Sequence, residues 1–86
     1  MPPNPTGPDL ASRAARDALA ANLRSRRKAL GLTVTALSER SEVSRQAIHG
    51  ILSGGRHPSL DTVSRLAHAL NTTAADLLTP PPPRLP

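Results

Sequence analysis

The sequence of 86 residues contains no cysteine and no aromatic residue. Without cysteine, the chain can form neither disulfides nor thiolate metal sites, and cysteine-based catalysis is excluded. Without aromatic side chains, a core has to be built from leucine, isoleucine, valine and alanine. Such a core favours closely packed short helices over a sheet, because strands are enriched in aromatic and β-branched residues.

Long apolar runs and acidic residues are also scarce. No run approaches the roughly 20 apolar residues that span a bilayer, and the first ten residues, MPPNPTGPDL, lack the basic start and apolar centre of a secretion signal. We therefore expect a cytoplasmic protein with no membrane partner. Eleven Lys and Arg against six Asp and Glu give a net charge of +5, which favours a polyanionic partner, although this excess alone is weak evidence.

The distribution of proline predicts a single domain between two short tails. Residues 1–9 are expected to be a flexible Pro-rich arm, residues 10–79 a helical domain, and residues 80–86 a Pro-rich tail. The arm carries no Lys or Arg before Arg13, so we do not expect it to insert into a DNA groove.

Apolar spacing and capping residues predict five helices and no strand. The first is expected from about Leu10 to Leu30, with Asp9 as its N-cap and Gly31 as its terminator. Its core face is predicted to carry Leu19, Leu23 and Leu30. The other helices are expected at residues 34–41, 45–53, 60–70 and 74–78, and apolar side chains predicted for the last two are Leu60, Val63, Leu66, Ala67, Leu70, Leu77 and Leu78.

The stretch from Thr33 to Ser53 is the most informative part of the sequence. It predicts two short helices joined by a tight turn, with apolar side chains on one side and Val43 in the turn. The side chains that remain outside on the second helix are Arg45, Gln46 and His49, all of them hydrogen-bond donors. A helix, a short turn and a second helix with a polar face are typical of a DNA-reading helix-turn-helix.

With these helices placed, the chain from Leu23 to Leu78 resembles the lambda-repressor-like (Cro/Xre-type) helix-turn-helix family. The resemblance rests on GLT at residues 31–33, LSERSEVSRQAI at residues 37–48, Gly54, PSL at residues 58–60 and LAHALNTTAADLL at residues 66–78. It implies an all-α, compact five-helix fold. It also implies sequence-specific binding to double-stranded DNA and, usually, transcriptional repression by a dimer at a two-fold operator.

Three positions depart from the family pattern. Glu42 occupies the turn position that is usually glycine, and Val34 replaces a glutamine that often helps to grip phosphate. Leu52 replaces a glutamate that often pairs with an arginine of the first helix. Arg27 therefore needs another partner, such as Thr35 or Glu39, or is free to contact DNA.

The resemblance directs the start of the helix at residues 45–53 into the major groove. Arg45 suits guanine O6 and N7, Gln46 suits adenine N6 and N7, and His49 can donate to guanine or to phosphate. Gly50 adds no side chain, which either permits a close approach to DNA or weakens the helix. Contacts to phosphate are expected from Thr33, Ser44, Arg56, His57 and Arg27.

No catalytic residue, metal site, cofactor or small-molecule ligand is indicated by the sequence, so an enzyme is not expected. The three histidines, His49, His57 and His68, lack a metal-binding spacing. A bundle of this size also leaves little room for a pre-organised pocket. The function expected is a DNA-binding transcriptional regulator, associated with the nucleoid through its DNA.

Two other functions stay open from the sequence. The first is an antitoxin that regulates its own operon, which would share the fold. The second is a protein-interaction module that has lost operator reading, for which Leu77, Leu78 and residues 80–83 are the expected surface. A homodimer is expected at least on DNA, with the helix at residues 74–78 as the candidate contact.

Overall fold

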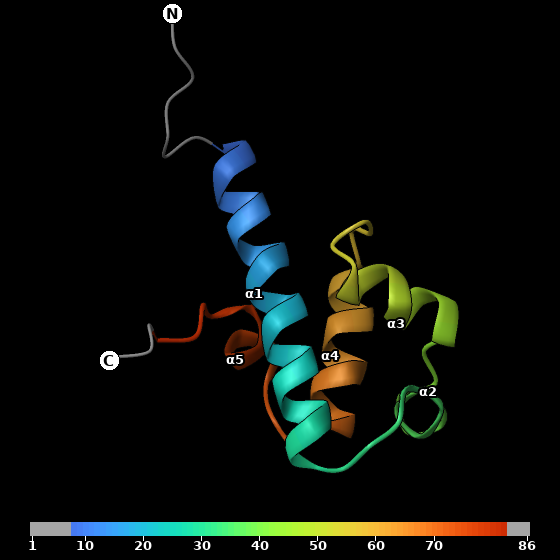
Figure 1. Ribbon diagram of the computed structural model, residues 1–86. Coiled ribbons are helices and arrows are strands. Elements are labelled where there is room, and N and C mark those ends of the chain that lie inside the picture. The colour runs from blue at the N-terminus through green and yellow to red at the C-terminus, as the bar shows by residue number, and fades with distance from the viewer. Residues whose placement is uncertain (1–7, 83–86) are drawn as a thin grey trace, which may run out of the picture.

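The computed structural model describes residues 8–82, and in this range it is built of five helices without a strand (Figure 1). The helices are α1 (Pro8–Ala29), α2 (Val34–Ser41), α3 (Arg45–Leu52), α4 (Leu60–Ala69) and α5 (Ala74–Leu78). The all-α fold class is therefore confirmed, and every boundary lies within two residues of its prediction. Most of the predicted N-terminal arm (residues 1–7) and of the predicted C-terminal tail (residues 83–86) lies outside the described residues.

The start of α1 differs from the prediction. The helix begins at Pro8 and includes Asp9 in its first turn, so residues 8 and 9 belong to the helix and not to the arm. Proline is well tolerated in a first turn, because its missing N–H would have no partner there. A carboxylate at this end is stabilised by the helix dipole without acting as the N-cap.

The end of α1 is a tight reversal at Gly31. The residue has a φ of +67°, and the N–H groups of Gly31 and Leu32 donate to the carbonyls of Lys28 and Arg27, each at 3.0 Å. This is the Schellman arrangement, which satisfies carbonyls of the last helical turn. The prediction that Leu30 lies in the core is wrong: Leu30 is 42% exposed. The chain reverses immediately after it, and Leu32 packs against the core instead.

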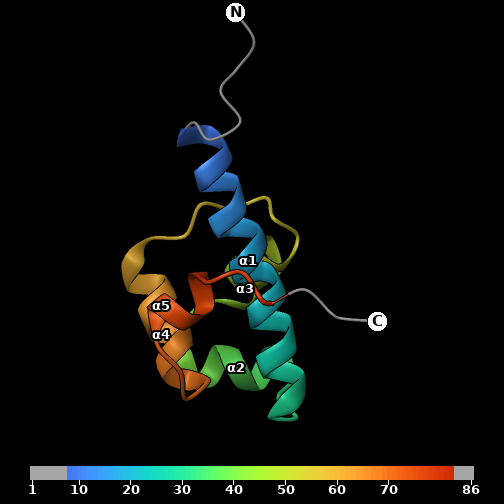
Figure 2. The same cartoon turned by 90° about the vertical axis from the view of Figure 1, so that its left-hand side faces the viewer.

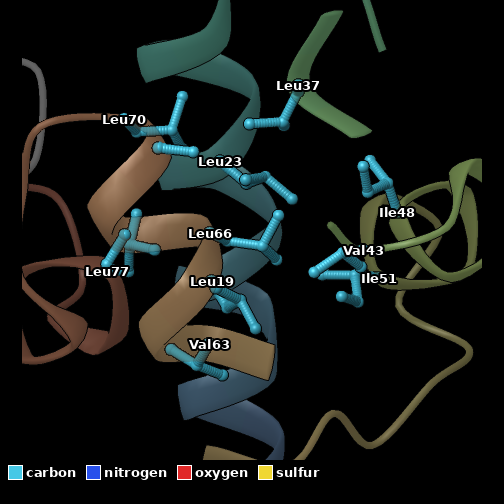
Figure 3. Packing of buried hydrophobic residues seen from close by; sticks show 12 residues of the cluster. Leu19, Leu23, Leu37, Val43, Ile48, Ile51, Val63, Leu66, Leu70 and Leu77 are labelled. Atoms are coloured by element: carbon cyan, nitrogen blue, oxygen red, sulfur yellow. The ribbon is translucent and has the colours of Figure 1, made fainter. Parts of the chain in front are cut away.

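One aliphatic core joins all five helices (Figure 3). Leucines of α1 and α4 point toward one another at its centre. Ile48 and Ile51 of α3 lie on one side of these leucines, and Leu77 of α5 lies on the other. The largest fully buried side chains are Leu19, Leu23, Leu37, Ile48, Leu66, Leu70 and Leu77. Burial of side chains this size is worth roughly 1.5–3 kcal/mol each, so the core, and not the propensity of such short helices, holds α2 and α3 in place.

Leu60 is a second error of the sequence prediction. It was assigned to the apolar stripe of α4, but 75% of it is exposed. Leu60 is the first residue of α4 and lies at the edge of that stripe. There it lines an open depression of about 160 Å³, together with Ala15 of α1, Pro58 and Leu78, and no helix covers it.

Helix α5 is held by α1 through an amide side chain. Asn22 Nδ2 donates to the carbonyls of Asp76, Leu77 and Thr79 at 3.2, 2.9 and 2.7 Å. Leu77 is fully buried and Leu78 is half-buried against the core. The prediction that these two leucines form a dimer contact or a partner surface is therefore wrong for Leu77, which is committed to the core of its own chain.

Candidate nucleic-acid interface

Helices α2 and α3 lie at one side of the molecule, and α3 stands at its edge (Figure 1). Each begins with a hydroxyl cap, as the sequence predicts. Thr33 Oγ1 accepts from the N–H of Ala36 at 3.0 Å, and Ser44 Oγ accepts from the N–H of Ala47 at 3.1 Å. Such caps satisfy helix-start donors that have no partner within the helix.

The turn between the two helices is intact although it lacks glycine. Glu42 adopts the left-handed conformation, with φ 60° and ψ 27°, which costs a residue with a Cβ atom roughly 1 kcal/mol. Its carboxylate lies 3.4 Å from the guanidinium of Arg65 on α4. Both side chains are largely exposed, so this pair adds little stability.

Two serines hold this turn, and sequence reasoning missed both. Ser41 is buried; its Oγ donates to the carbonyl of Leu37 at 2.7 Å and accepts from the N–H of Val43 at 3.2 Å. Ser38 Oγ donates to the carbonyl of Val43 at 2.6 Å. Val43, buried as predicted, thus has both of its backbone groups satisfied by side chains. Serines at residues 38 and 41, in the helix that directly precedes a non-glycine turn, were the signal available in the sequence.

Helix α3 divides cleanly into a buried and an exposed side. Ile48 and Ile51 are buried in the core. The three residues predicted to read bases, Arg45, Gln46 and His49, are all exposed. Their side chains make no hydrogen bond or ion pair with any other residue from 8 to 82. No residue of the described chain therefore competes with an external ligand for these donors.

Arg56 and His57, the two loop residues predicted to contact phosphate, lie against different helices. Arg56 lies against Gly50 of α3, where an added Cβ would meet Arg56 Cγ at 2.5 Å. His57 faces α1 instead, with its Nδ1 at 3.3 Å from Arg16 Nη1. Figure 2 shows this loop passing beside the N-terminal half of α1. Arg56 thus joins the exposed face of α3, whereas His57 ties the loop to α1.

Arg27 is committed to its own chain. Its side chain is half-buried, Nη1 donates to the carbonyl of Leu32 at 2.8 Å, and Nε is buried without an acceptor among the described residues. The partner that Arg27 needed is thus a backbone carbonyl, and neither Thr35 nor Glu39. This places Arg27 in the corner between α1 and α2, apart from the exposed face of α3.

A further arginine, not predicted, links α1 to α3. Arg24 Nη2 donates to the carbonyl of Leu52, the last residue of α3, at 3.1 Å. Where a glutamate often pairs with an arginine of the first helix, this chain therefore uses a backbone carbonyl. Leu52 itself packs against the core. Val34, the third departure from the family pattern, also packs against the core, so its apolar side chain stabilises the fold.

Two further findings concern clusters of metal-binding residues and long apolar helices in the described part of the chain. Between residues 8 and 82, His, Cys, Asp and Glu nowhere form a group of three or more that could hold a metal ion. None of the described helices is long and apolar enough to cross a membrane. His68 lies exposed on α4, beside Arg40 and Arg65.

Comparisons with known proteins agree with this geometry. The helix-turn-helix family HTH_3 matches residues 23–77. No curated protein sequence matches the chain. The structure resembles a hypothetical transcription factor, NHTF, from Neisseria, with 27% identity, a TM-score of 0.74, and 78% of this chain and 77% of that chain covered.

Two further solved structures are more similar in sequence. The clp gene regulator ClgR from Corynebacterium glutamicum is 36% identical, with a TM-score of 0.69 over 74% of this chain and 68% of that one. The restriction-modification controller protein C.AhdI from Aeromonas hydrophila is 30% identical, with a TM-score of 0.67 over 74% of this chain and 94% of that one. The chain belongs to HTH_3, the Cro/Xre-type helix-turn-helix family of DNA-binding transcriptional regulators.

Proposed function

We propose that this protein is a sequence-specific transcriptional repressor that inserts α3 into the major groove of double-stranded DNA. The observation that carries the proposal is the two-sided character of α3. Its isoleucines are buried in the core, while Arg45, Gln46 and His49 are exposed and make no bond to the described chain. A helix fixed by one side and open on the other presents its donors without a further conformational change.

The chemistry of these three side chains suits base edges. The guanidinium of Arg45 can donate two hydrogen bonds to O6 and N7 of guanine. The amide of Gln46 can donate to N7 of adenine and accept from its N6 amino group. His49, one turn from Arg45, can donate to guanine or to a phosphate, depending on its tautomer.

Phosphate contacts would orient the helix in the groove. Thr33 and Ser44 are exposed at the starts of α2 and α3, and each hydroxyl that accepts a capping N–H can still donate its proton to a phosphate oxygen. Free N–H groups at these helix starts also favour an anion. Arg56 and His57 add two more donors from the loop after α3. Arg27, being half-buried, would contribute only after leaving Leu32.

We further propose that two copies bind one operator. A single α3 contacts only a few base pairs, and two copies on half-sites about 34 Å apart would multiply that selectivity. A dimer bound across a promoter would exclude RNA polymerase and so lower transcription. No effector, cofactor or catalytic step is required.

Selection of bound duplexes from a random DNA pool tests the proposal. The wild-type protein should enrich one motif with two-fold symmetry. Arg45→Ala and Gln46→Ala should each weaken binding to that motif by roughly 1–3 kcal/mol while leaving binding to unrelated DNA almost unchanged. Arg13→Ala, which removes an exposed charge from the far part of α1, is the matched control and should bind the motif with little loss.

The outcomes distinguish sequence-specific contacts to bases from non-specific electrostatic binding to phosphate. An equal loss on all DNA sequences would show that Arg45 and Gln46 touch only phosphate. If no motif were enriched, the proposal that α3 recognises a specific base sequence would be contradicted. For repression, the selected site is placed across the promoter of a reporter gene, and expression of the protein should lower transcription; a rise would make the protein an activator.

A further inference from the structure

The side chain of Arg56 occupies the space that a side chain at residue 50 would need. A Cβ atom at Gly50 would lie 2.5 Å from Arg56 Cγ and 2.7 Å from Arg56 Cδ and Nε. The backbone of Gly50 does not explain the glycine, because Gly31 and Gly54, and not Gly50, are the described glycines with a positive φ. Within a helix, alanine is more favourable than glycine. A side chain at residue 50 would therefore have to displace Arg56.

The loop is also fastened to Gly50 through its backbone. The carbonyl of Gly50 accepts from the N–H of Gly55 at 3.0 Å and from Ser53 Oγ at 2.9 Å. These two bonds fold the loop back over the last turn of α3. The residue that follows, Arg56, is thereby brought onto the helix that it has just left.

Arg56 lies on the exposed side of α3. Residues four apart share one face of a helix, so Gly50 lies one turn beyond Gln46 on the side opposite the buried Ile48. Arg56 Cγ, Cδ and Nε thus lie within 2.7 Å of the place that a Cβ atom at residue 50 would take. Arg56 belongs to the loop, but its side chain lies beside Gly50, on the same face of α3 as Gln46.

We propose that Gly50, because it lacks a side chain, lets Arg56 lie on the exposed face of α3. There Arg56 donates to a guanine edge and adds sequence selectivity. This goes beyond the phosphate contact expected for an arginine in a loop, and it rests on the proposed insertion of α3 into the major groove. The planar guanidinium matches O6 and N7 of guanine. Gly50 acts only through Arg56 and is a positioning residue.

Gly50→Ala tests this positioning directly. The new Cβ collides with a flexible and exposed side chain, so Arg56 is expected to leave α3 while the helix gains a better helix former. The melting temperature, followed by circular dichroism, should be unchanged or higher. Affinity for the selected duplex should nevertheless fall roughly 5- to 150-fold, with little change on unrelated DNA. A merely structural glycine would not raise stability and weaken reading together.

A double-mutant cycle assigns the effect to Arg56. Arg56→Ala should lose affinity to the same extent as Gly50→Ala, and the double variant should bind no more weakly than Arg56→Ala alone. Gly55→Ala is the matched control, because a Cβ there has ordinary contacts, the nearest being Ser53 Oγ at 3.5 Å. It should bind the selected duplex like the wild type.

Arg56→Lys separates a guanine contact from a phosphate contact. Lysine keeps the charge but not the planar pair of donors, so the motif should lose its preference at one base pair in each half-site. An unchanged motif for Arg56→Ala, which has no donor at all, would overturn the guanine contact. Wild-type affinity of the Gly50→Ala variant for the selected duplex would overturn the positioning role of Gly50. Losses of affinity that add in the double variant would overturn it as well. Failure of the wild-type protein to enrich any motif would instead overturn the reading role of α3 itself.

Discussion

At the residue scale, Ser41 is the buried polar side chain on which the helix-turn-helix depends. Ser41→Ala removes the acceptor of the Val43 N–H, and Val43 is only 7% exposed. A buried donor without a partner costs roughly 1–3 kcal/mol. We expect the free energy of unfolding, measured by urea denaturation, to fall by that amount. Ser64→Ala, at an exposed position of α4, is the control and should change it little.

A substitution at Glu42 is expected to raise the free energy of unfolding, in contrast to Ser41→Ala. Glycine adopts the left-handed conformation without the Cβ clash, so Glu42→Gly should raise the free energy of unfolding by up to about 1 kcal/mol. Glu42→Ala also removes the exposed pair with Arg65 but keeps the Cβ atom, and it should not stabilise the protein. Equal effects of the two substitutions in thermal unfolding would show that the side chain, and not the backbone, sets the cost.

At the scale of elements, α5 owes its position to α1. A helix of five residues is far too short to form alone, and it is fixed by burial of Leu77 and by the three carbonyls that accept from Asn22. Asn22→Ala should destabilise the protein by roughly 1–2 kcal/mol. Native-state hydrogen exchange should show the amides of α5 losing protection before those of α2; uniform loss would mean that α5 does not open on its own.

The elements that sequence reasoning placed best are those with a local signal at both ends. The bounds of α2 and α5 were predicted correctly, because each helix begins directly after a hydroxyl residue that caps it, Thr33 and Thr73. These features depend on neighbours in the sequence. The identity of the exposed face of α3 was also predicted, because the positions of the isoleucines define its opposite side.

The errors and omissions concern what lies next to a residue in space. Leu30 and Leu60 fit the apolar pattern but stand at helix ends that no other element covers. The contact of Arg56 with Gly50 joins a loop to the preceding helix, and the bond of Arg24 to Leu52 joins residues 28 positions apart. Periodicity contains no information on such pairs.

At the scale of the whole molecule, the structure leaves little surface for a stable dimer without DNA. Leu77 is buried, and between residues 8 and 82 the exposed large apolar residues, Leu10, Leu30 and Leu60, are far apart in the sequence. We expect sedimentation at micromolar concentration to show a monomer alone and two copies on the selected duplex. A change of the spacing between half-sites by five base pairs, half a helical turn, should abolish joint binding. A dimer that persists without DNA would contradict this prediction.

The aliphatic core also has a consequence for observing the protein. Each of the seven largest fully buried side chains is leucine or isoleucine, so each ends in methyl groups, and together they sample all five helices. Selective labelling of these methyl groups would place a magnetic resonance probe on every helix without any substitution. A duplex that carries no signal of its own could then be titrated in, and the methyl spectrum would reveal whether contact at α3 is felt as far away as Leu77.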